Sequence, residues 1–425
     1  MRKRWLTLLP VLLIAALILA ACGGGGQQPA DDEGDGAPVD SDAIKLGILL
    51  PETGDLGWLG APMVQAAKLA VKIVNENGGI LGREVVAVAV DTQTDDVAAR
   101  DGIEYLINVE GVQAVVGAAG SGETMAALAQ AVPGQVVMVS PSATSPDFTT
   151  YEDDGFFFRT APSDALQGAV MAKLAWDESC STATTIALNN PYGVGFKNVF
   201  AETYAALGGE VAADILFDPA GTTFTSEVQQ IADAGADCVI VIAYPETGSI
   251  ILREAYTQGI LDVDRWFLSE GLQSDELADL VGQDDEGKYV IEGIRGTQPK
   301  SVGGDTYDAF VAAYEAEYGE PPTGPFEAHT FDAALLILFA IEQAGVYDGA
   351  AIRDHIASVA SPEGEAVSEV ARALELIRAG EEINYEGASG SVDMDEVGDV
   401  TAEYEMWRIT ADGSIEILGD VALPE

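Results

Sequence analysis

Four hydroxyl side chains follow one of the most apolar runs of the sequence, and they are the first residues that could take part in chemistry. The run VVMV (136–139) continues into SPSATSP, which carries Ser140, Ser142, Thr144 and Ser145 together with two prolines. Proline lacks an amide donor and stiffens a loop, so we expect the amides of residues 142–144 to be free to bind something. The loop therefore supplies either a nucleophile or a cradle for a small polar ligand.

A serine nucleophile needs a neighbouring base, and the sequence offers few bases. Its two histidines, His329 and His355, both fall within predicted helices, and no G-x-S-x-G elbow is present. His329 could approach a cleft from the segment GPFEAH, but a histidine packed on a helix is the simpler interpretation. We therefore predict no catalytic residue. Phosphate-binding and dinucleotide-binding glycine motifs are missing as well, so we predict no cofactor.

One acidic segment, DMDEVGD, has the spacing of a calcium loop through Asp393, Asp395 and Asp399. However, Val397 occupies a ligand position, and Tyr404 stands where a bidentate acid is needed. No predicted helix precedes the segment. We interpret it as a turn and predict no metal site.

The charge balance excludes whole classes of partner. The 425 residues include 70 acidic and 20 basic side chains, which gives a formal net charge of −50. Such a chain repels nucleic acids and anionic membrane surfaces. Its length and its 48% hydrophobic content are sufficient for two ordinary cores. We therefore expect two domains, no nucleic-acid partner, and contact with a membrane only through an anchor.

The N-terminus has the pattern of an export signal. A basic start, MRKRW, precedes the apolar run LTLLPVLLIAALILA, and small residues lead to Cys22. The end of this segment resembles a bacterial lipoprotein signal, which implies that residues 1–22 direct export and that Cys22 is lipidated. Residues 23–42 are rich in glycine and acids and predict a flexible tether. We expect an exported protein that is lipid-anchored to the outer face of the cell membrane or lies in the periplasm.

From residue 43 onward, short apolar runs alternate with amphipathic stretches of helical length, a pattern typical of parallel α/β sheets covered on both faces. The pattern restarts after FFFRTAPSD, so we predict two doubly wound parallel sheets. Residues 298–385 read as mostly helical, and a hairpin turned at Asp412-Gly413 follows. The predicted strands are IKLGILL, REVVAVAV, VQAVVG, GQVVMVS, TTIAL, VAADILF, CVIVIAY and RWFLSEG.

The two remaining cysteines flank strands of the second predicted sheet. Cys180 lies just before TTIAL and Cys238 opens CVIVIAY. The usual doubly wound order places these two strands side by side with both cysteines near the same end. An exported protein permits disulfides, so we predict a Cys180–Cys238 bond. Two buried free thiols are the alternative.

Ligands of open parallel sheets bind beyond the carboxyl ends of the strands, so the loops that leave the strands are the candidates. Ser121 opens the helix after VVGAAG, where its hydroxyl and the first free amides suit an anion; a plain N-cap serine is the alternative. Glu270 directly follows RWFLS, and Gly271 permits a close approach of the backbone.

These loops together resemble a known family, the leucine/isoleucine/valine-binding proteins, which are type I solute-binding subunits of ABC transporters. The motifs are GILLPETGDLGWLGAPMVQAAKLAVKIVNENGGILGREV, VVGAAGSGET, SPSATSP, NNPYGVG, AYPETG, SEG and YEGASGSVDMDEVGDV. The resemblance covers residues 44–420 and implies two doubly wound lobes joined by three crossovers. It divides the chain into the first part of lobe 1 (43–161), the main part of lobe 2 (162–297), the second part of lobe 1 (298–385), and a final crossover with the hairpin (386–425).

The resemblance also implies roles for individual residues. Ser121 matches the serine that holds the α-carboxylate of an amino acid through its hydroxyl and amide, and Ser142 matches a position that contributes its backbone. Thr144 matches the threonine that binds both ends of the amino acid, and Glu270 matches the acid that pairs with its ammonium group. Aromatic positions of the ligand site are matched by Trp58, Tyr192 and Tyr244. A long segment at residues 360–380 and Ala243, where some members carry an aromatic residue, depart from the pattern and concern side-chain specificity.

The implied function is a monomeric solute receptor that binds an amino acid, branched-chain or otherwise aliphatic, and delivers it to a membrane permease. A ligand-binding sensor for amides or other small organic molecules on the same fold is the alternative. An exported hydrolase is a third hypothesis, and the missing base argues against it.

Overall fold

Two sheets organise the part of the chain that the computed structural model describes, residues 42–300 and 303–423. The first sheet is entirely parallel, with the strand order β2-β1-β3-β4-β5. Four of its strands coincide with predicted apolar runs, whereas the three-residue strand β5 was not predicted. The strands are β1 (Ile44–Leu50), β2 (Val85–Asp91), β3 (Ala114–Gly117), β4 (Val137–Ser140) and β5 (Phe157–Arg159).

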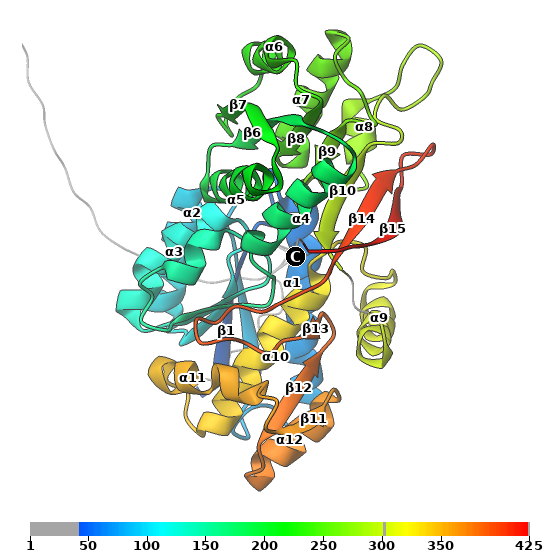
Figure 1. The fold of residues 1–425 in the computed structure, drawn as a ribbon. Helices are drawn as coiled ribbons and strands as arrows, with labels where there is room; N and C mark the ends of the chain where they lie inside the picture. Colours follow the sequence, from blue (N-terminus) through cyan, green and yellow to red (C-terminus); the bar gives the residue numbers. More distant parts are fainter. Residues whose placement is uncertain (1–41, 301–302, 424–425) are drawn as a thin grey trace, which may run out of the picture. The chain divides into compact units, whose positions relative to one another are not determined.

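Helices cover both faces of this sheet, as its continuous apolar strands require. Alternate residues of β1 belong to different cores: Ile48 packs with the first helical layer and Leu49 with the second. Two helices pack together in each layer (Figure 1). They are α1 (Gly57–Glu76) with α10 (Glu327–Ala344) on one face, and α2 (Asp96–Tyr105) with α3 (Ser121–Gly134) on the other.

The second sheet is mixed, with the strand order β15-β14-β10-β9-β8-β6-β7. Its strands from β7 to β10 pair in parallel, but β14 pairs antiparallel with β10, and β15 with β14 (Figure 1). The expectation of a purely parallel sheet with a separate hairpin was therefore wrong, because the hairpin supplies partners for the exposed edge of β10. The strands are β6 (Thr182–Leu188), β7 (Glu210–Phe217), β8 (Cys238–Ile242), β9 (Trp266–Leu268), β10 (Arg295–Pro299), β14 (Tyr404–Ile409) and β15 (Ile415–Val421).

The chain passes between the two sheets three times. The first passage lies between β5 and α4 (Asp164–Asp177), the second follows β10, and the third leads from β13 (Gly390–Ser391) to β14. The predicted α/β class, with two sheets built mainly of parallel strands and joined by three crossovers, is confirmed. Helices α5 (Pro191–Leu207), α6 (Thr225–Ala234), α7 (Pro245–Thr257) and α8 (Leu277–Val281) belong to the second-sheet part of the chain.

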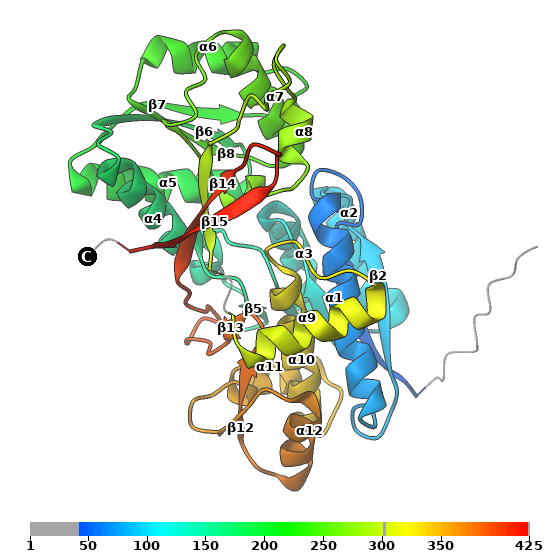
Figure 2. The same cartoon turned by 90° about the vertical axis from the view of Figure 1, so that its right-hand side faces the viewer.

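The region after β10 is less helical than we predicted. It contains α9 (Asp305–Tyr318), α11 (Gly349–Ile356) and α12 (Val370–Ala379), but also a small sheet of β11 (Glu365–Val367), β12 (Ile383–Gly387) and β13. Figure 2 shows α12 beside β12 at its lower end. The strand β11 has only three residues, two of them exposed. So short and exposed a run carries no apolar pattern from which it could have been predicted.

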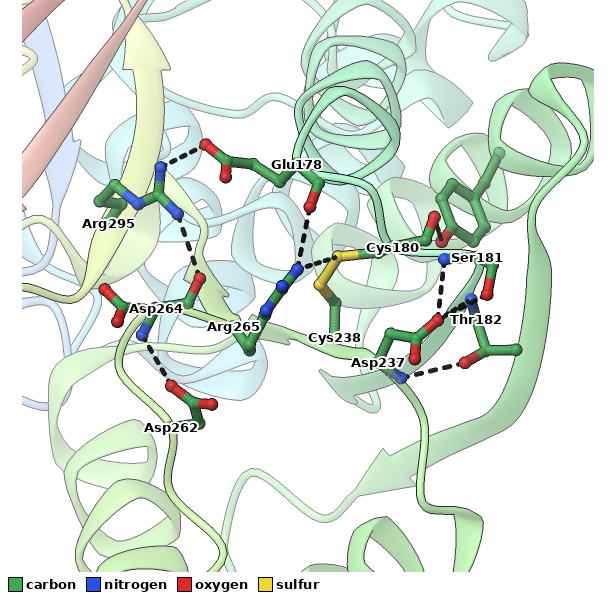
Figure 3. Close-up of a disulfide and its surroundings, with 11 residues drawn as sticks. Glu178, Cys180, Ser181, Thr182, Asp237, Cys238, Asp262, Asp264, Arg265 and Arg295 are labelled. Atoms are coloured by element: carbon green, nitrogen blue, oxygen red, sulfur yellow. Dashed lines mark hydrogen bonds and ion pairs between the residues drawn. A yellow bond between two sulfur atoms is a disulfide. The ribbon is translucent and has the colours of Figure 1, made fainter.

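The two cysteines of the second sheet are joined at the amino ends of their strands, with their Cα atoms 5.9 Å apart (Figure 3). A polar network surrounds the bond: the carboxylate of Asp237 accepts hydrogen bonds from the amides of Ser181 (2.9 Å) and Thr182 (3.0 Å). Because all of these residues lie at the amino ends of β6 and β8, they are at the opposite edge of the sheet from the strand-following loops.

The predicted leader, residues 1–22 with Cys22, lies outside the described residues, as does the tether 23–42 except for Asp42. Among the residues described, no single helix is long and apolar enough to span a membrane. One pair of helical segments, Glu327–Ala344 and Gly349–Val359, is long and apolar enough when taken together, but the two segments are bent by 111° at the break between them.

Candidate functional site

One pocket contains all seven residues that the sequence singled out as ligand contacts. It encloses about 360 Å³, its open mouth included, and lies where loops leave the carboxyl ends of strands in both sheets. The seven residues are Trp58, Ser121, Ser142, Thr144, Tyr192, Tyr244 and Glu270. The structure thus brings together side chains that are up to 212 positions apart in the sequence, from Trp58 to Glu270.

On the first-sheet side, Ser121 is not the cap of its helix. The N-cap of α3 is Gly120, whose amide donates to Oε2 of Glu123 at 3.0 Å. The Ser121 hydroxyl instead accepts a hydrogen bond from the amide of Ser145, at 3.2 Å. A hydroxyl that accepts one hydrogen bond still has its own proton to donate. The N-cap interpretation is therefore wrong, and Ser121 is left with a donor for a ligand.

The loop after β4 is built around Ser140. Its hydroxyl donates to the carbonyl of Ala118 (2.6 Å) and accepts from the amides of Ala143 (3.0 Å) and Ser142 (3.4 Å). Our expectation that all three amides of residues 142–144 would be free was therefore wrong, because Ser140 turns back and binds two of them. The Ser142 hydroxyl is also engaged, since it donates to the carbonyl of Ala119 at 3.1 Å. These bonds fix the shape of the loop before any ligand arrives.

On the second-sheet side, two tyrosines form one wall of the pocket. Tyr192 lies in the first turn of α5, and Tyr244 directly precedes α7. Their rings are stacked, with centroids 5.5 Å apart and planes inclined by 7°. The Tyr192 hydroxyl donates to Oγ of Ser269 at 2.8 Å. The pair presents a flat, mostly apolar surface, and the hydroxyl of Tyr192 is already engaged.

Glu270 lies beside these tyrosines with a carboxylate that lacks a full set of partners. It lies two residues after the end of β9 and is only 4% exposed, and its Oε2 has no hydrogen-bond partner among the described residues. Burial raises the pKa of Glu270 to about 7, partly offset by hydrogen bonding to Tyr192 and Gln167. As predicted, Gly271 permits close packing, because a Cβ there would lie 2.7 Å from the carbonyl oxygen of Ala243.

A second buried acid, Asp164, adjoins the pocket and was missed in the sequence. It is fully buried at the start of α4, and neither carboxylate oxygen makes a hydrogen bond of good geometry with another described group. Burial and the nearby charge of Glu270 raise the pKa of Asp164, while the Thr144 hydroxyl and Arg159 partly offset this rise. Aspartate is common in the first turn of a helix, so sequence gave no reason to single it out.

Two further residues missed in the sequence close the pocket with apolar surface. Pro325 and Phe326 line it from the loop before α10, and the partly buried Trp58 lines it from the first turn of α1. The indole N–H of Trp58 has no hydrogen-bond partner within the described part of the chain. Neither Pro325 nor Phe326 follows a β-strand, so a search restricted to strand-following loops overlooked both. The pocket therefore combines polar ends with an apolar wall.

The histidines do not complete a catalytic pair among the residues described. His329 is buried on α10 with its ring 5.4 Å from that of Phe326, and burial lowers its pKa to about 4. His355 directs its Nδ1 to the carbonyl of Ala351, at 2.7 Å. Across residues 42–300 and 303–423, neither ring is hydrogen-bonded to a hydroxyl of the pocket. Within the described residues, the hydroxyls of the pocket therefore have no histidine partner.

The segment DMDEVGD forms a turn. One carboxylate oxygen of Asp395 accepts hydrogen bonds from the amides of Val397 (2.9 Å) and Asp399 (3.0 Å). Asp399 pairs with Arg159 and does not face Asp395 as a joint metal ligand would. In the part of the chain that the structure describes, no group of three or more histidine, cysteine or acidic side chains could hold a metal ion.

Comparison with known proteins places this geometry in context. Residues 43–413 match the family model of the periplasmic binding proteins. The chain is 31% identical over 394 residues to the chemotactic signal transduction system substrate-binding protein BasB of Halobacterium salinarum, covering 88% of each chain. It is 27% identical over 363 residues to a leucine-, isoleucine-, valine-, threonine- and alanine-binding protein of Pseudomonas aeruginosa, covering 85% of this chain and 88% of that protein. A solved leucine-binding protein of Thermotoga maritima has a TM-score of 0.75 at 24% identity, covering 89% of this chain and 99% of that one.

Proposed function

The chain belongs to the periplasmic binding protein family, and from this premise we propose that it is the extracytoplasmic solute-binding subunit of an ABC importer. It binds an amino acid, branched-chain or otherwise aliphatic, between two lobes. Residues 43–161 and 298–385 form lobe 1, residues 162–297 form the main part of lobe 2, and residues 386–425 form the final crossover and the hairpin. The lobes close on the ligand by rotation about the three connections, and the closed form delivers the amino acid to a membrane permease.

The observation that carries this proposal is the opposite chemistry of the two walls of one pocket. Hydroxyl donors at Ser121 and Thr144 face the pocket from the first-sheet side, and the incompletely partnered carboxylate of Glu270 faces it from the second. A buried ionised carboxylate that lacks a full set of hydrogen bonds is stabilised by a cation beside it. An α-amino acid carries a carboxylate and an ammonium group on one carbon, so it meets both requirements at once. Phe326 and the stacked tyrosines suit an aliphatic side chain.

A thermal-shift screen over amino acids, amides and small acids tests the proposal, because a ligand that binds only the native state raises the melting temperature. We expect leucine, isoleucine or valine to produce the largest shifts. Calorimetry with each of these amino acids and its deaminated acid then tests the ammonium requirement. If a deaminated acid binds as tightly as its parent amino acid, the ligand is not recognised as an amino acid.

The remaining parts of the proposal concern partners and location. The protein acts as a monomer, is exported, and is held at the outer face of the membrane or in the periplasm by lipid on Cys22. Its partner is the permease of the transporter, and it needs no cofactor. Mass spectrometry of the purified N-terminus tests the anchor, since an unmodified Cys22 in protein taken from the native membrane would contradict it.

A second candidate function is a receptor that presents its ligand to a chemotaxis system. It is favoured by the 31% identity to BasB, whose name assigns that protein to chemotactic signal transduction. Both functions use the same binding step, so ligand affinity cannot separate them. The neighbouring genes can: adjacent permease and ATPase genes favour transport, and an adjacent transducer gene favours sensing.

A further inference from the structure

Arg159 lies directly behind the hydroxyl loop of the pocket and is completely buried. It is the last residue of β5, with an exposed side-chain fraction of 0%. Its Nη1 donates to the carbonyl oxygens of Ala143 (3.2 Å) and Ser145 (2.9 Å). These two carbonyls flank Thr144, one of the pocket-lining residues. A single guanidinium group therefore holds the backbone on both sides of Thr144.

The remaining nitrogens of Arg159 bind a residue far along the chain. Nε and Nη2 form a two-pronged ion pair with the carboxylate of Asp399, at 2.6 and 2.8 Å. The hydroxyl of Thr149 joins the pair, since it donates to Asp399 (2.6 Å) and accepts from Arg159 (3.1 Å). The amide of Arg159 also donates to the carbonyl of Gly398 at 3.1 Å. The loop around Thr144 is thus tied to the third connection between the sheets.

This arrangement requires the geometry of arginine and not merely its charge. Only a planar guanidinium has enough fixed N–H donors to bind two carbonyls, a hydroxyl and a carboxylate at the same time. A buried ion pair of this kind is weak evidence for stability, because apolar residues of similar volume often stabilise a fold as well. What apolar residues cannot do is hold the two carbonyls beside Thr144 at set positions.

We propose that Arg159 is a positioning residue of the ligand site, with Asp399 as its counter-ion. Arg159 does not line the pocket, and its contribution is to present the Ser142–Thr144 loop in the conformation that receives the ligand. The inference rests on the proposed function in one respect: it takes the ligand of that loop to be an amino acid. It also gives a role to the acidic segment 393–399, because the last acid of this segment, Asp399, holds Arg159 behind the pocket loop.

The test compares Asp399→Asn with Glu396→Gln, each in the full-length protein. Asn is nearly isosteric with Asp but cannot hold the guanidinium by charge. Glu396 is exposed in the same turn, so its substitution removes the same charge and provides the control. Calorimetry with leucine, isoleucine or valine, well below the melting temperature, should show binding weakened about tenfold or more for Asp399→Asn and by less than twofold for Glu396→Gln.

A merely structural role for the pair predicts a different result. It would lower the melting temperature of Asp399→Asn and leave the dissociation constant of the folded protein unchanged, and that outcome would overturn the proposal. If Asp399→Asn does not fold, Thr149→Val serves instead, because it leaves the ion pair in place and removes the hydroxyl that braces it. We expect Thr149→Val to weaken binding about threefold, and an unchanged affinity would count against positioning.

Hydrogen exchange in the ligand-free protein separates this inference from the proposed function. We expect the peptide that covers residues 141–148 to exchange faster in Asp399→Asn than in the wild type and in Glu396→Gln. If the wild type binds no amino acid but this difference is seen, the proposed function fails and the positioning of the loop stands. If the wild type binds an amino acid and exchange is unchanged, the positioning role fails alone.

Discussion

The two walls of the pocket differ in how completely their polar groups are satisfied before a ligand arrives. On the first-sheet wall, Ser140 binds two amides of its own loop, Ser121 accepts from Ser145, and Arg159 holds the carbonyls. On the second-sheet wall, Glu270 retains an oxygen without a partner, and Asp164 beside it lacks well-formed hydrogen bonds altogether.

The difference shows that the first-sheet wall is preorganised, whereas the second-sheet wall has polar atoms that a ligand can still bind. Neutral hydroxyls and amides can satisfy one another, so the first wall can be rigid without a ligand. Two neighbouring buried carboxylates cannot satisfy one another while both are ionised. They either share a proton or wait for a cation. Burial raises the pKa of Glu270 to about 7, and burial together with the nearby charge of Glu270 raises the pKa of Asp164. On the proposed function, the ammonium group of the ligand supplies that cation.

The largest expected effect removes the charge from the second wall. Glu270→Gln should weaken amino-acid binding by about thirtyfold to several thousandfold, because removing one partner of a buried charge pair typically costs about 2 to 5 kcal/mol, at about 1.4 kcal/mol per tenfold change. Calorimetry measures the change, and Glu276→Gln, at an exposed position six residues later, is the matched control. Full affinity in Glu270→Gln would mean that the second wall does not bind an ammonium group.

The next effect concerns the donors of the first wall. Ser121→Ala and Thr144→Ala should each weaken binding by about tenfold to 150-fold, since hydrogen bonds to charged groups contribute about 1.5 to 3 kcal/mol. The melting temperature of ligand-free Ser121→Ala should fall, because the buried amide of Ser145 loses its acceptor, so affinities are compared well below the melting temperature. Thr150→Ala, at an exposed position of the same loop region, is the control. If both pocket variants bind as the wild type does, the donors of this wall only shape the loop.

A change of pH affects the two walls differently. The pKa of Glu270 is raised to about 7 in the ligand-free protein, mainly by burial. An ammonium group favours the ionised carboxylate, so below pH 7 binding must displace a proton and affinity falls as pH falls. The loss should approach tenfold between pH 8 and about pH 6, at one decade per unit below the pKa. Titrations in buffers of different ionisation enthalpy measure the released proton directly, and Glu270→Gln should abolish the dependence.

The smallest effect on binding is expected from the disulfide, which lies at the edge of the second sheet opposite to the pocket. Replacing Cys180 and Cys238 by serine should lower the stability of the protein by about 2 to 4 kcal/mol, the usual contribution of a disulfide. The dissociation constant should not change, because no pocket residue contacts the bond. Alkylation without reductant tests the bond itself, and two reactive thiols in the native protein would contradict it.

Much of the molecule follows from local patterns in the sequence. The apolar runs predict most strands of both sheets, and their alternation with helices predicts parallel pairing. Parallel strands end at a common edge, so Ser121 and Thr144 are expected together at one sheet and Glu270 at the ligand-facing edge of the other. That these two edges share one pocket was implied only by the family resemblance. The same regularity places Cys180 near Cys238, because the doubly wound order sets their strands side by side. Each of these inferences depends on a short stretch of chain and a general rule of sheet topology.

Other features were decided only by the tertiary structure. Asp164 has the sequence context of any acid at a helix start, and its burial beside Glu270 arises from the meeting of two distant segments. Phe326 closes the pocket from a loop that follows no strand. Asp399 pairs with Arg159, which lies 240 positions earlier in the sequence. Among 70 acidic residues, nothing in the local sequence indicates that Asp164 and Asp399 have these partners. Burial and partnership are properties of three-dimensional neighbours, and the sequence alone does not specify which of many equivalent side chains will acquire them.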